Sequence, residues 1–532
     1  MATGGITSDD SDKGLYSLVS SDRKRIPFAM ALLNLFASSL TTTLLIYSLL
    51  GILLISFLNK FRKRPPINYP PGPIPLPIIG NLHQLDLKRL YKSLVELSEK
   101  YGSVYSVSLG PEKVVVLAGY ETVKNALINH ADEFLGRPDV PIMNVLKEGS
   151  GVVWSNGDPW KQMRRFMLST LRDFGMGKKS IEDKIIEEAG FLVKKIDSYK
   201  GQPFDTDVIT NFATANVICS IVFGDRFEYD DKTFLSIGNM VHESFRLLGS
   251  PMVQVFNAYP FLRFLPGSHK EICKQFEMLK TCLTEIIKVK QQEMNENDIR
   301  SFIDTYSVKQ REEAGNPDTY FHENNLVITT SDLFIAGMGT AATTIRWALY
   351  IMMKYPEIQG KVQEEIDRVI GSERSPRMDD RKYMPYTDAV IHEVQRFANI
   401  APLGIPRSTT VDINFQGYFI PKGTYIVPLL ASVLYDKSQW EKPDEFNPAH
   451  FLDTAGKFVK RDAFMPFSAG RRICPGETLA KVELFLFFVT LLQKFDLHPP
   501  PGVTDLDLTP VVGGILNPKP HQVCVVPHAH RC

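Results

Sequence analysis

The segment from Phe467 to Gly476 holds the one cysteine whose surroundings predict chemistry. It reads Phe-Ser-Ala-Gly-Arg-Arg-Ile-Cys-Pro-Gly, with Cys474 between Gly470 and Gly476 and a helix-forming run from Glu477 directly after it. Both glycines lack a side chain and so allow another group to approach the loop closely. The positive end of a helix dipole favours a thiolate over a thiol. The segment therefore predicts a thiolate that binds a metal axially, whereas most lone cysteines are small buried hydrophobic residues.

The ordered set of Phe467, Gly470, Arg472, Cys474 and Gly476 resembles the haem-binding signature of the cytochrome P450 family, the haem-thiolate monooxygenases. The resemblance implies haem b as the cofactor and Cys474 as the axial ligand of its iron. It also implies that Arg472 meets a haem propionate, because a guanidinium pairs well with a carboxylate.

Further residues are assigned to the haem propionates by the same resemblance. Trp160 and Arg164 are four residues apart and share one face of a helix. Arg137 in Gly-Arg-Pro and Arg407 in Pro-Arg-Ser occur where related proteins have arginines of this role. Two propionates need such partners because an unpaired buried carboxylate is costly. Without Cys474, the spacing of Trp160 and Arg164 would indicate only the edge of an amphipathic helix.

Glu393, Arg396 and His450 are predicted to form a structural group. A spacing of three places Glu393 and Arg396 on one helix face, and the apolar residues around them indicate burial. An exposed pair would contribute only about 0–1 kcal/mol. The resemblance adds His450 as the third member of an ion-pair network, at a position where much of the family has arginine. We expect this group to support the fold without a catalytic role.

The segment Ala336-Gly-Met-Gly-Thr-Ala departs from the family pattern, Ala-Gly-x-acid-Thr-Thr. Gly339 stands at the position of the acid and Ala341 where a second threonine is common. Gly337 and Gly339 in mid-helix cost roughly 1 kcal/mol each relative to alanine. They predict either a kink packed against a flat ring or, as we favour, a groove over the haem where oxygen binds. Thr340 would then donate a hydrogen bond to the oxygen.

The missing acid predicts weak coupling between electron use and product formation. A positioned acid–base group contributes about 10²–10⁴-fold, which is roughly 3–5 kcal/mol of barrier. Thr343 and Thr344 lie about a turn further along the helix and are poor substitutes. We therefore expect water relayed by Thr340 to carry protons more slowly, and less product per electron pair than in acid-bearing relatives.

A mainly helical body with a smaller β portion is predicted to position these residues. Residues 113–117 read as a strand, and the segments on either side of Pro421-Lys-Gly predict a hairpin formed by 417–420 and 424–429. A proline at 356 ends the longest helical run. Helical periods cover 181–196, 325–354, 357–370, 386–397 and 477–495. The resemblance implies the cytochrome P450 fold with an N-terminal transmembrane anchor.

Four regions are predicted along the chain: a polar extension (1–25), a transmembrane anchor (26–58), a basic and proline-rich hinge (59–80) and the haem-thiolate catalytic domain (81–532). The anchor carries no charge and is longer than a signal-peptide core.

The basic run after the anchor places the catalytic domain in the cytosol, although Arg23-Lys-Arg on the other flank opposes this orientation. Translation from Met30 would remove the opposing charges, so Met1 and Met30 both remain candidate starts. The alternating prolines favour a stiff hinge over a ligand for an adaptor domain.

The composition indicates which classes of partner and substrate to expect. The formal net charge is zero, so nothing points to nucleic acid, and the six cysteines lack a disulfide framework, which suits reduced thiols. The largely apolar stretches 141–151, 334–335, 400–405 and 511–516, which line the pocket by family resemblance, predict lipophilic small-molecule substrates.

The resemblance runs from the anchor to about residue 527, and phrases such as FGDRFEY (223–229) are similar to vertebrate microsomal family 2, most of all to the K subfamily of fishes. It implies an endoplasmic reticulum enzyme that receives electrons from NADPH through NADPH-cytochrome P450 reductase, with cytochrome b5 as an optional second partner. The basic residues Lys161, Arg165 and Arg471 are candidates for docking that acidic reductase.

Three functions remain open from the sequence. The leading one is a membrane-bound monooxygenase that inserts one atom of O₂ into an apolar substrate. The alternative is a haem-thiolate isomerase or dehydratase acting on lipid peroxides without NADPH, which Gly339 fits and Thr340 opposes. The third is a non-catalytic haem- or lipid-binding protein, which the intact set around Cys474 disfavours.

Overall fold

The computed structural model describes residues 39–55 and 67–529. The predicted extension 1–25, Met30, the outer parts of the anchor (26–38 and 56–58) and the first part of the hinge (59–66) lie outside the described residues. The chain divides into an N-terminal unit, in which one helix is described, and a large unit that holds residues 67–75 and everything from Ile79 onward.

The described helix of the N-terminal unit is apolar and exposed. It covers Ser39–Ile55, and consecutive side chains such as Leu44, Leu45 and Ile46 are 57%, 69% and 58% exposed. At about 1.5 Å per residue it is about 25 Å long, close to the ~30 Å of a bilayer core. An apolar surface on every face suits a helix in lipid. Its role as an anchor stays a prediction.

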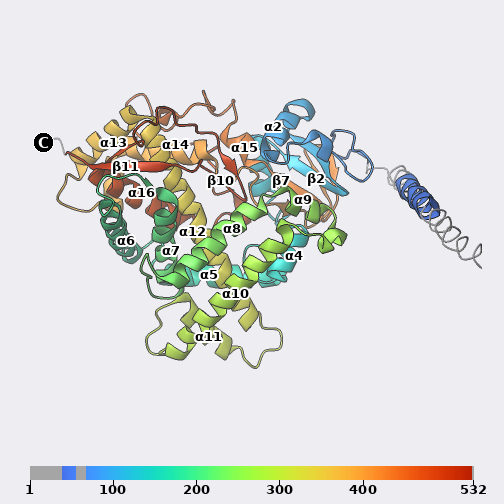
Figure 1. Cartoon of the computed structure of the whole chain (residues 1–532), viewed down its shortest axis with the longest axis horizontal. Helices are drawn as coiled ribbons and strands as arrows, with labels where there is room; N and C mark the ends of the chain where they lie inside the picture. The colour runs from blue at the N-terminus through green and yellow to red at the C-terminus, as the bar shows by residue number, and fades with distance from the viewer. Residues whose placement is uncertain (1–38, 56–66, 530–532) are drawn as a thin grey trace, which may run out of the picture. The chain divides into compact units, whose positions relative to one another are not determined.

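The large unit is mainly helical, as predicted. Its longest helix, α12 (Glu323–Lys354), is the one described helix that is long and apolar enough to cross a membrane, but 78% of its most apolar window is buried inside protein. α12 is therefore a core helix, and Figure 1 shows it passing behind α8. The other α-helices are α2 (Leu90–Tyr101), α3 (Tyr120–Lys124), α4 (Pro141–Lys147), α5 (Gly157–Asp173), α6 (Lys179–Asp197), α7 (Thr206–Val222), α8 (Lys232–Leu248), α9 (Pro251–Ala258), α10 (Ser268–Glu293), α11 (Phe302–Glu312), α13 (Pro356–Val369), α14 (Pro385–Ala398), α15 (Leu430–Leu434) and α16 (Glu477–Lys494).

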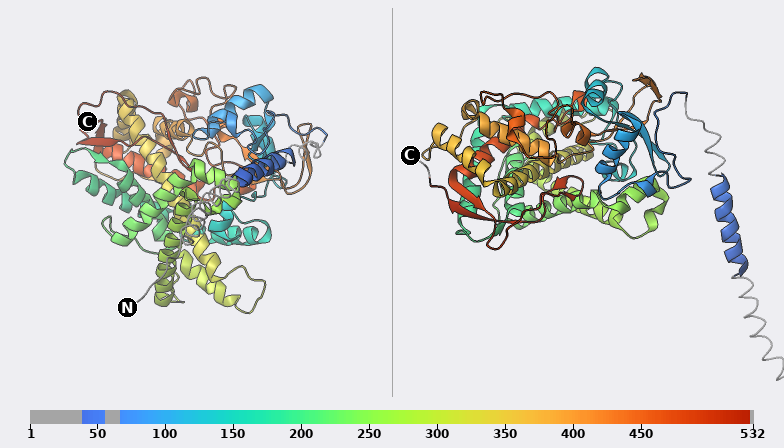
Figure 2. Two further views of the ribbon diagram at one scale, coloured as in Figure 1. Left: turned by 45° about the vertical axis from the view of Figure 1, so that its right-hand side comes forward. Right: turned by 90° about the horizontal axis from the view of Figure 1, so that it is seen from above.

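The strands form small sheets. The largest has the order β1-β2-β7-β4, in which β2 and β7 are parallel and the other pairs antiparallel. In both views of Figure 2 this sheet lies at the opposite end of the folded body from α6 and α13. The strands are β1 (Val104–Leu109), β2 (Glu112–Leu117), β3 (Phe204–Asp205), β4 (Arg407–Ser408), β5 (Ile413–Phe415), β6 (Tyr418–Ile420), β7 (Tyr425–Pro428), β8 (Phe495–His498), β9 (Val511–Val512), β10 (Leu516–Asn517) and β11 (Gln522–Pro527).

The predicted helices and the strand at 113–117 are confirmed, and Pro356 ends α12 and begins α13. The predicted hairpin is wrong. β6 pairs with β5 instead, across Gln416 and Gly417, whose φ angles of 49° and 84° suit a tight two-residue turn. β7 joins β2 from a distant part of the chain, because the segment after Pro421 hydrogen-bonds back to Thr409 and continues into the larger sheet.

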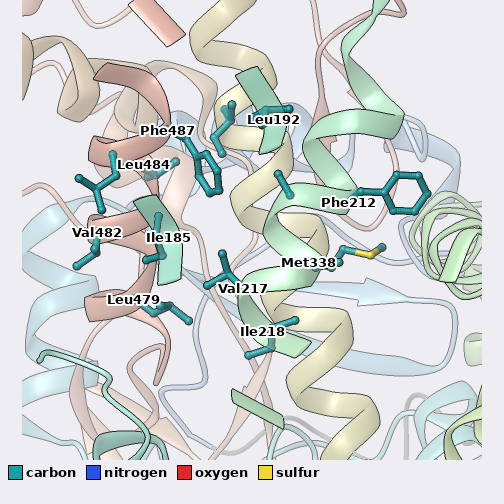
Figure 3. Packing of buried hydrophobic residues seen from close by; sticks show 14 of the residues in the cluster. Ile185, Leu192, Phe212, Val217, Ile218, Met338, Leu479, Val482, Leu484 and Phe487 are labelled. Atoms are coloured by element: carbon teal, nitrogen blue, oxygen red, sulfur yellow. The ribbon is translucent and has the colours of Figure 1, made fainter. Parts of the chain in front are cut away.

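A single large hydrophobic cluster holds α12 in place. α6, α7, α12 and α16 contribute, among others, Ile185, Val217, Met338 and Phe487, which Figure 3 shows converging between the helices. α12 is buried on almost all sides, and a helix that is apolar all round belongs in a core. The predicted oxygen-site residues, from Ala336 to Thr340, are thus carried by a well-packed helix.

Candidate functional site

The loop that carries Cys474 is closed by backbone geometry. Gly470 has a φ of +73°, and a Cβ atom there would lie 1.7 Å from the carbonyl oxygen of Leu127. Only glycine fits that position. The amide of Cys474 then donates to the carbonyl of Phe467 at 3.1 Å, which fixes the cysteine at the end of the loop. Gly476 differs, because a Cβ there would make an ordinary 3.8 Å contact with Sγ of Cys474.

The surroundings of Cys474 shift the pKa of its thiol in opposite directions. Burial among protein atoms raises the pKa of Cys474 above its usual range, and this is the largest effect. The amides of Gly476 and Glu477, at the start of α16, and the guanidinium of Arg164 each lower that pKa. The side chain nonetheless keeps solvent access. A metal that binds this sulfur would complete the deprotonation, since a coordinating thiol loses its proton.

Four arginines gather close to this loop: Arg137, Arg164, Arg407 and Arg472. Among the described residues, none of the four forms an ion pair with Asp or Glu. Burial and the neighbouring guanidiniums lower the pKa of Arg137 well below its usual value, and they lower those of Arg407 and Arg472 to about 9. Buried cations without a counter-charge are costly, so this cluster is built for an anionic group.

Most of their hydrogen bonds go to backbone carbonyl groups, with weaker ones from Arg407 to Ser468 and from Arg472 to Asn156, and some donors remain unused. Arg137 donates to the carbonyls of Val153 and Pro406, and Arg164 donates to that of Ile473 at 2.6 Å. Arg472 donates to Ser155 O at 2.8 Å.

Nε of Arg407, Nη1 of Arg472 and Nε1 of Trp160 are buried without a hydrogen-bond partner in the part of the chain that the structure describes. The guanidinium of Arg472 lies 3.9 Å from the ring centre of Trp160. The structure thus brings the predicted propionate residues together with unused donors, which fits a group carrying two carboxylates such as haem b.

On α12, the predicted oxygen-site residues do not all face one way. Ala336 is exposed and Thr340 half-buried, one turn apart on an otherwise buried helix. A Cβ at Gly337 would lie 3.0 Å from Cγ1 of Ile218 in α7, and one at Gly339 would lie 2.7 Å from Cε2 of Phe245 in α8. Ala336 and Thr340 therefore share the accessible side, and the two glycines face neighbouring helices.

The hydroxyl groups near Gly339 are already engaged. Thr340 Oγ1 donates to Ala336 O at 2.7 Å, and Thr344 Oγ1 donates to Thr340 O at 2.9 Å. Thr343 Oγ1 donates to Oδ1 of Asn517 at 3.0 Å. The predicted donation from Thr340 to oxygen therefore requires its proton to leave Ala336 O, whereas its lone pairs remain able to accept a hydrogen bond.

The predicted structural group is assembled in the interior. Arg396 donates from Nε and Nη2 to the two carboxylate oxygens of Glu393 at 2.8 and 2.7 Å, and both side chains are 0% exposed. Nδ1 of His450 lies 3.2 Å from both of those oxygens. The amide of Asn447 also donates to Glu393. The arrangement suits a scaffold that joins α14 to η5 (Pro448–Phe451).

A pocket of about 520 Å³ opens beside Cys474, on the side of α5 and the start of α16. Its lining includes three cations, Arg164, Arg172 and Lys178, against one carboxylate, Glu477, so the pocket is basic on balance. Of the residues expected at a substrate pocket, Phe334 is buried in the core with its ring 6.3 Å from that of Phe223.

Sequence reasoning missed Phe245, a half-buried residue of α8 that meets Gly339. No motif marks it, and only the contact between helices reveals it.

Comparison with known proteins identifies the family. The profile described as Cytochrome P450 matches residues 70–525. The chain is 52% identical to cytochrome P450 2K1 of Oncorhynchus mykiss over 461 residues, which cover 86% of this chain and 91% of the relative. It is 52% identical to cytochrome P450 2K6 of Danio rerio over 455 residues, or 85% and 90% of the two chains. With cytochrome P450 2C39 of Mus musculus the identity is 47% over 487 residues, or 91% and 99%.

Proposed function

The chain belongs to the cytochrome P450 family of haem-containing monooxygenases, and on that premise we propose that it oxidises lipophilic substrates with electrons delivered from NADPH by a reductase. The observation that carries the site assignment is the cluster beside Cys474 of three buried arginines and the half-buried Arg164, none of which pairs with a carboxylate among the described residues. Cys474 would bind the iron, and Arg407, Arg472 and Trp160 would hold the propionates through their unused donors, while Arg137 would add positive charge beside them.

Bound haem would supply the reductive activation of O₂, and the protein supplies position and protons. The accessible strip of α12 at Ala336 and Thr340 gives a small substrate and oxygen a place beside a helix that is otherwise closed. Thr340 Oγ1 donates to Ala336 O across 2.7 Å and can accept a hydrogen bond from water. Glu393, Arg396 and His450 stabilise the fold behind the site.

We further propose that proton delivery limits this enzyme. No carboxylate stands at position 339, and the hydroxyls of Thr343 and Thr344 are bonded to Asn517 and to the backbone. Water must therefore serve as the proton source through Thr340. Loss of a positioned acid costs about 10²–10⁴-fold in proton transfer, so part of the reducing power ends in hydrogen peroxide.

The partners follow from the exposed surfaces. The exposed apolar helix Ser39–Ile55 supports a single-pass anchor at 26–58 in the endoplasmic reticulum membrane, followed by the hinge (59–80) and a cytosolic catalytic domain (81–532).

The basic pocket beside Cys474 and the exposed cations around it support docking of an acidic reductase, with cytochrome b5 as an optional donor. Arg165 is exposed there, whereas Lys161 and Arg471 pair with Asp158 and Asp132. Arg165 is accordingly the stronger candidate of the three.

A reconstituted assay tests the function. Full-length protein, NADPH-cytochrome P450 reductase and NADPH are combined with a fatty acid or an aromatic substrate, and product, peroxide and NADPH are counted. We expect NADPH-dependent product together with peroxide, both abolished in Cys474→Ser. Cys282→Ser, a change at a half-buried cysteine outside the site, serves as the matched control. A Cys474→Ser variant that forms product as fast as the control would refute the proposal.

The alternative, an isomerase or dehydratase acting on lipid peroxides, is kept because of Gly339. Such rearrangements need no external proton relay, so an apolar environment at position 339 would not impair them. Conversion of a fatty-acid hydroperoxide without NADPH, combined with no NADPH use on any substrate, would select this alternative.

A further inference from the structure

The side chain of Asn156 pairs with the backbone of Arg137. Its Oδ1 accepts a hydrogen bond from the amide of Arg137 at 2.7 Å, and its Nδ2 donates to the carbonyl of the same residue at 3.0 Å. A carboxamide carries an acceptor and a donor side by side, so it can exchange two bonds with one residue as a neighbouring strand does. Oδ1 of Asn156 also accepts a weaker bond from Nη2 of Arg472, at 3.4 Å.

The segment that ends at Arg137 supports two further arginines of the site. The carbonyl two residues before Arg137 accepts a hydrogen bond from Nε of Arg472 at 3.1 Å. Gly136 forms a β-bridge with Ser408 of β4, the strand that begins with Arg407, through bonds of 3.0 and 2.7 Å. A displacement of this segment would therefore move three of the four arginines together.

Asn156 does not cap α5, although it stands at the position for doing so. Asparagine is among the most favoured N-cap residues, because its side-chain oxygen can accept from an amide of the first turn. Within the described residues the side chain of Asn156 makes no such bond. By contrast, Asp231 caps α8 and Ser301 caps α11 in the usual way. Asn156 is exposed, so its hydrogen bonds, and not packing, direct its side chain to Arg137.

The side chain of Asn156 is also neutral, beside arginines that lack a counter-charge. Arg137 and Arg472 are only 7% and 6% exposed. An aspartate at position 156 would have the same shape, but it would bring a negative charge to both guanidinium groups and would offer no donor to the carbonyl of Arg137. The amide thus fixes the two arginines without reducing their attraction for another anionic group.

We propose that Asn156 is a positioning residue for the haem propionates. It orients Arg137 and Arg472 through neutral hydrogen bonds and leaves their charge available to the carboxylates of the cofactor. The inference rests on the proposed function, because haem is the group that these arginines would meet. Asn156 acts through the arginines and has no contact with haem in this account. Residues that orient the direct ligands of a bound group typically change its affinity by about 10–100-fold when they are replaced.

Two substitutions at position 156 test the role. Serine and aspartate are both favoured N-cap residues and can cap α5, and the position is exposed, so both variants are expected to fold. Asn156→Ser removes the paired donor and acceptor. Asn156→Asp keeps the shape and adds a negative charge. Asn414→Ser and Asn414→Asp, at an exposed position of β5, are the matched controls for the same two changes.

Two measurements on the full-length holoenzyme decide the inference: the rate of haem transfer to excess apomyoglobin, and the propionate bending bands in the resonance Raman spectrum. Transfer should be faster by about fivefold in Asn156→Ser, which loses hydrogen bonds, and by about 10–100-fold in Asn156→Asp. Both variants should shift the propionate bands, and neither Asn414 variant should change the rate or the bands.

Haem that leaves both Asn156 variants as slowly as the wild type would overturn the inference. Faster transfer with unshifted propionate bands would also overturn it, because a purely structural role produces that result. Both outcomes leave the proposed function intact, since they require a holoenzyme. A wild-type chain that shows no haem absorbance would instead refute the proposed function, and this inference with it.

Discussion

Replacement of Arg396 by leucine is expected to destabilise the protein severely. The guanidinium makes two bonds to Glu393 and donates to the carbonyls of Leu434, Pro443 and Glu445 at 2.8–3.0 Å, and all but the last of these contacts are fully buried. Removing one partner of a buried ion pair costs about 3–5 kcal/mol. Three carbonyls that lose their donor add about 1 kcal/mol each. The sum of about 6–8 kcal/mol is comparable to the whole stability of a typical domain, about 5–15 kcal/mol.

The assay is urea unfolding followed by tryptophan fluorescence, for which the buried Trp440 is a local reporter, 5.4 Å from the guanidinium. Lys442→Leu is the matched control, because Lys442 and Glu445 have the same spacing of three but are 58% and 64% exposed. That change should cost at most about 1 kcal/mol.

A double variant separates the two contributions to this loss. Glu393→Leu with Arg396→Leu removes the unpaired carboxylate but leaves the three carbonyls without donors, so it should recover part of the stability. A shift of the urea midpoint by Arg396→Leu no larger than that by Lys442→Leu would refute a structural role of this ion pair.

Three further predictions concern the site and the core. Arg407→Met should leave the haem-free protein at least as stable as the wild type, because a buried uncompensated cation is removed. The same change should speed the transfer of haem to apomyoglobin. Arg471→Met, a change at an exposed arginine, should alter neither the stability nor the rate of haem transfer. Gly470→Ala should prevent haem incorporation, measured by absorbance, because its Cβ would overlap Leu127 O. Burial raises the pKa of Glu483 well above 4.5, so the wild type loses stability as pH rises above that value. Glu483→Gln removes this loss, and its urea midpoint should therefore increase relative to that of the wild type as pH rises. A difference in midpoint that stays constant with pH would contradict this.

Residues whose contacts are with near neighbours in the sequence could be predicted. The Cys474 loop is a continuous segment, and Glu393 and Arg396 lie one helical turn apart, so local spacing carries their geometry. The propionate set needed the family resemblance, because Arg137 and Arg472 are far apart in sequence and nothing local links them.

Contacts between distant elements were not predictable. The partner of β7 is β2, and a strand pattern alone does not say which strand it will join. The glycines of α12 suggested a groove, yet their directions follow from the way α7 and α8 cross α12, which places Ile218 against Gly337 and Phe245 against Gly339. A single sequence shows that a glycine is present but not which neighbour requires it.

The function proposed for this chain is the NADPH-dependent insertion of one oxygen atom from O₂ into an apolar substrate. The most direct test is turnover of the reconstituted enzyme under ¹⁸O₂, with mass spectrometry of the product. We expect one ¹⁸O atom per product molecule, formed only with NADPH, and no labelled product with Cys474→Ser. Product that contains no ¹⁸O, or that forms equally well without NADPH, would contradict it.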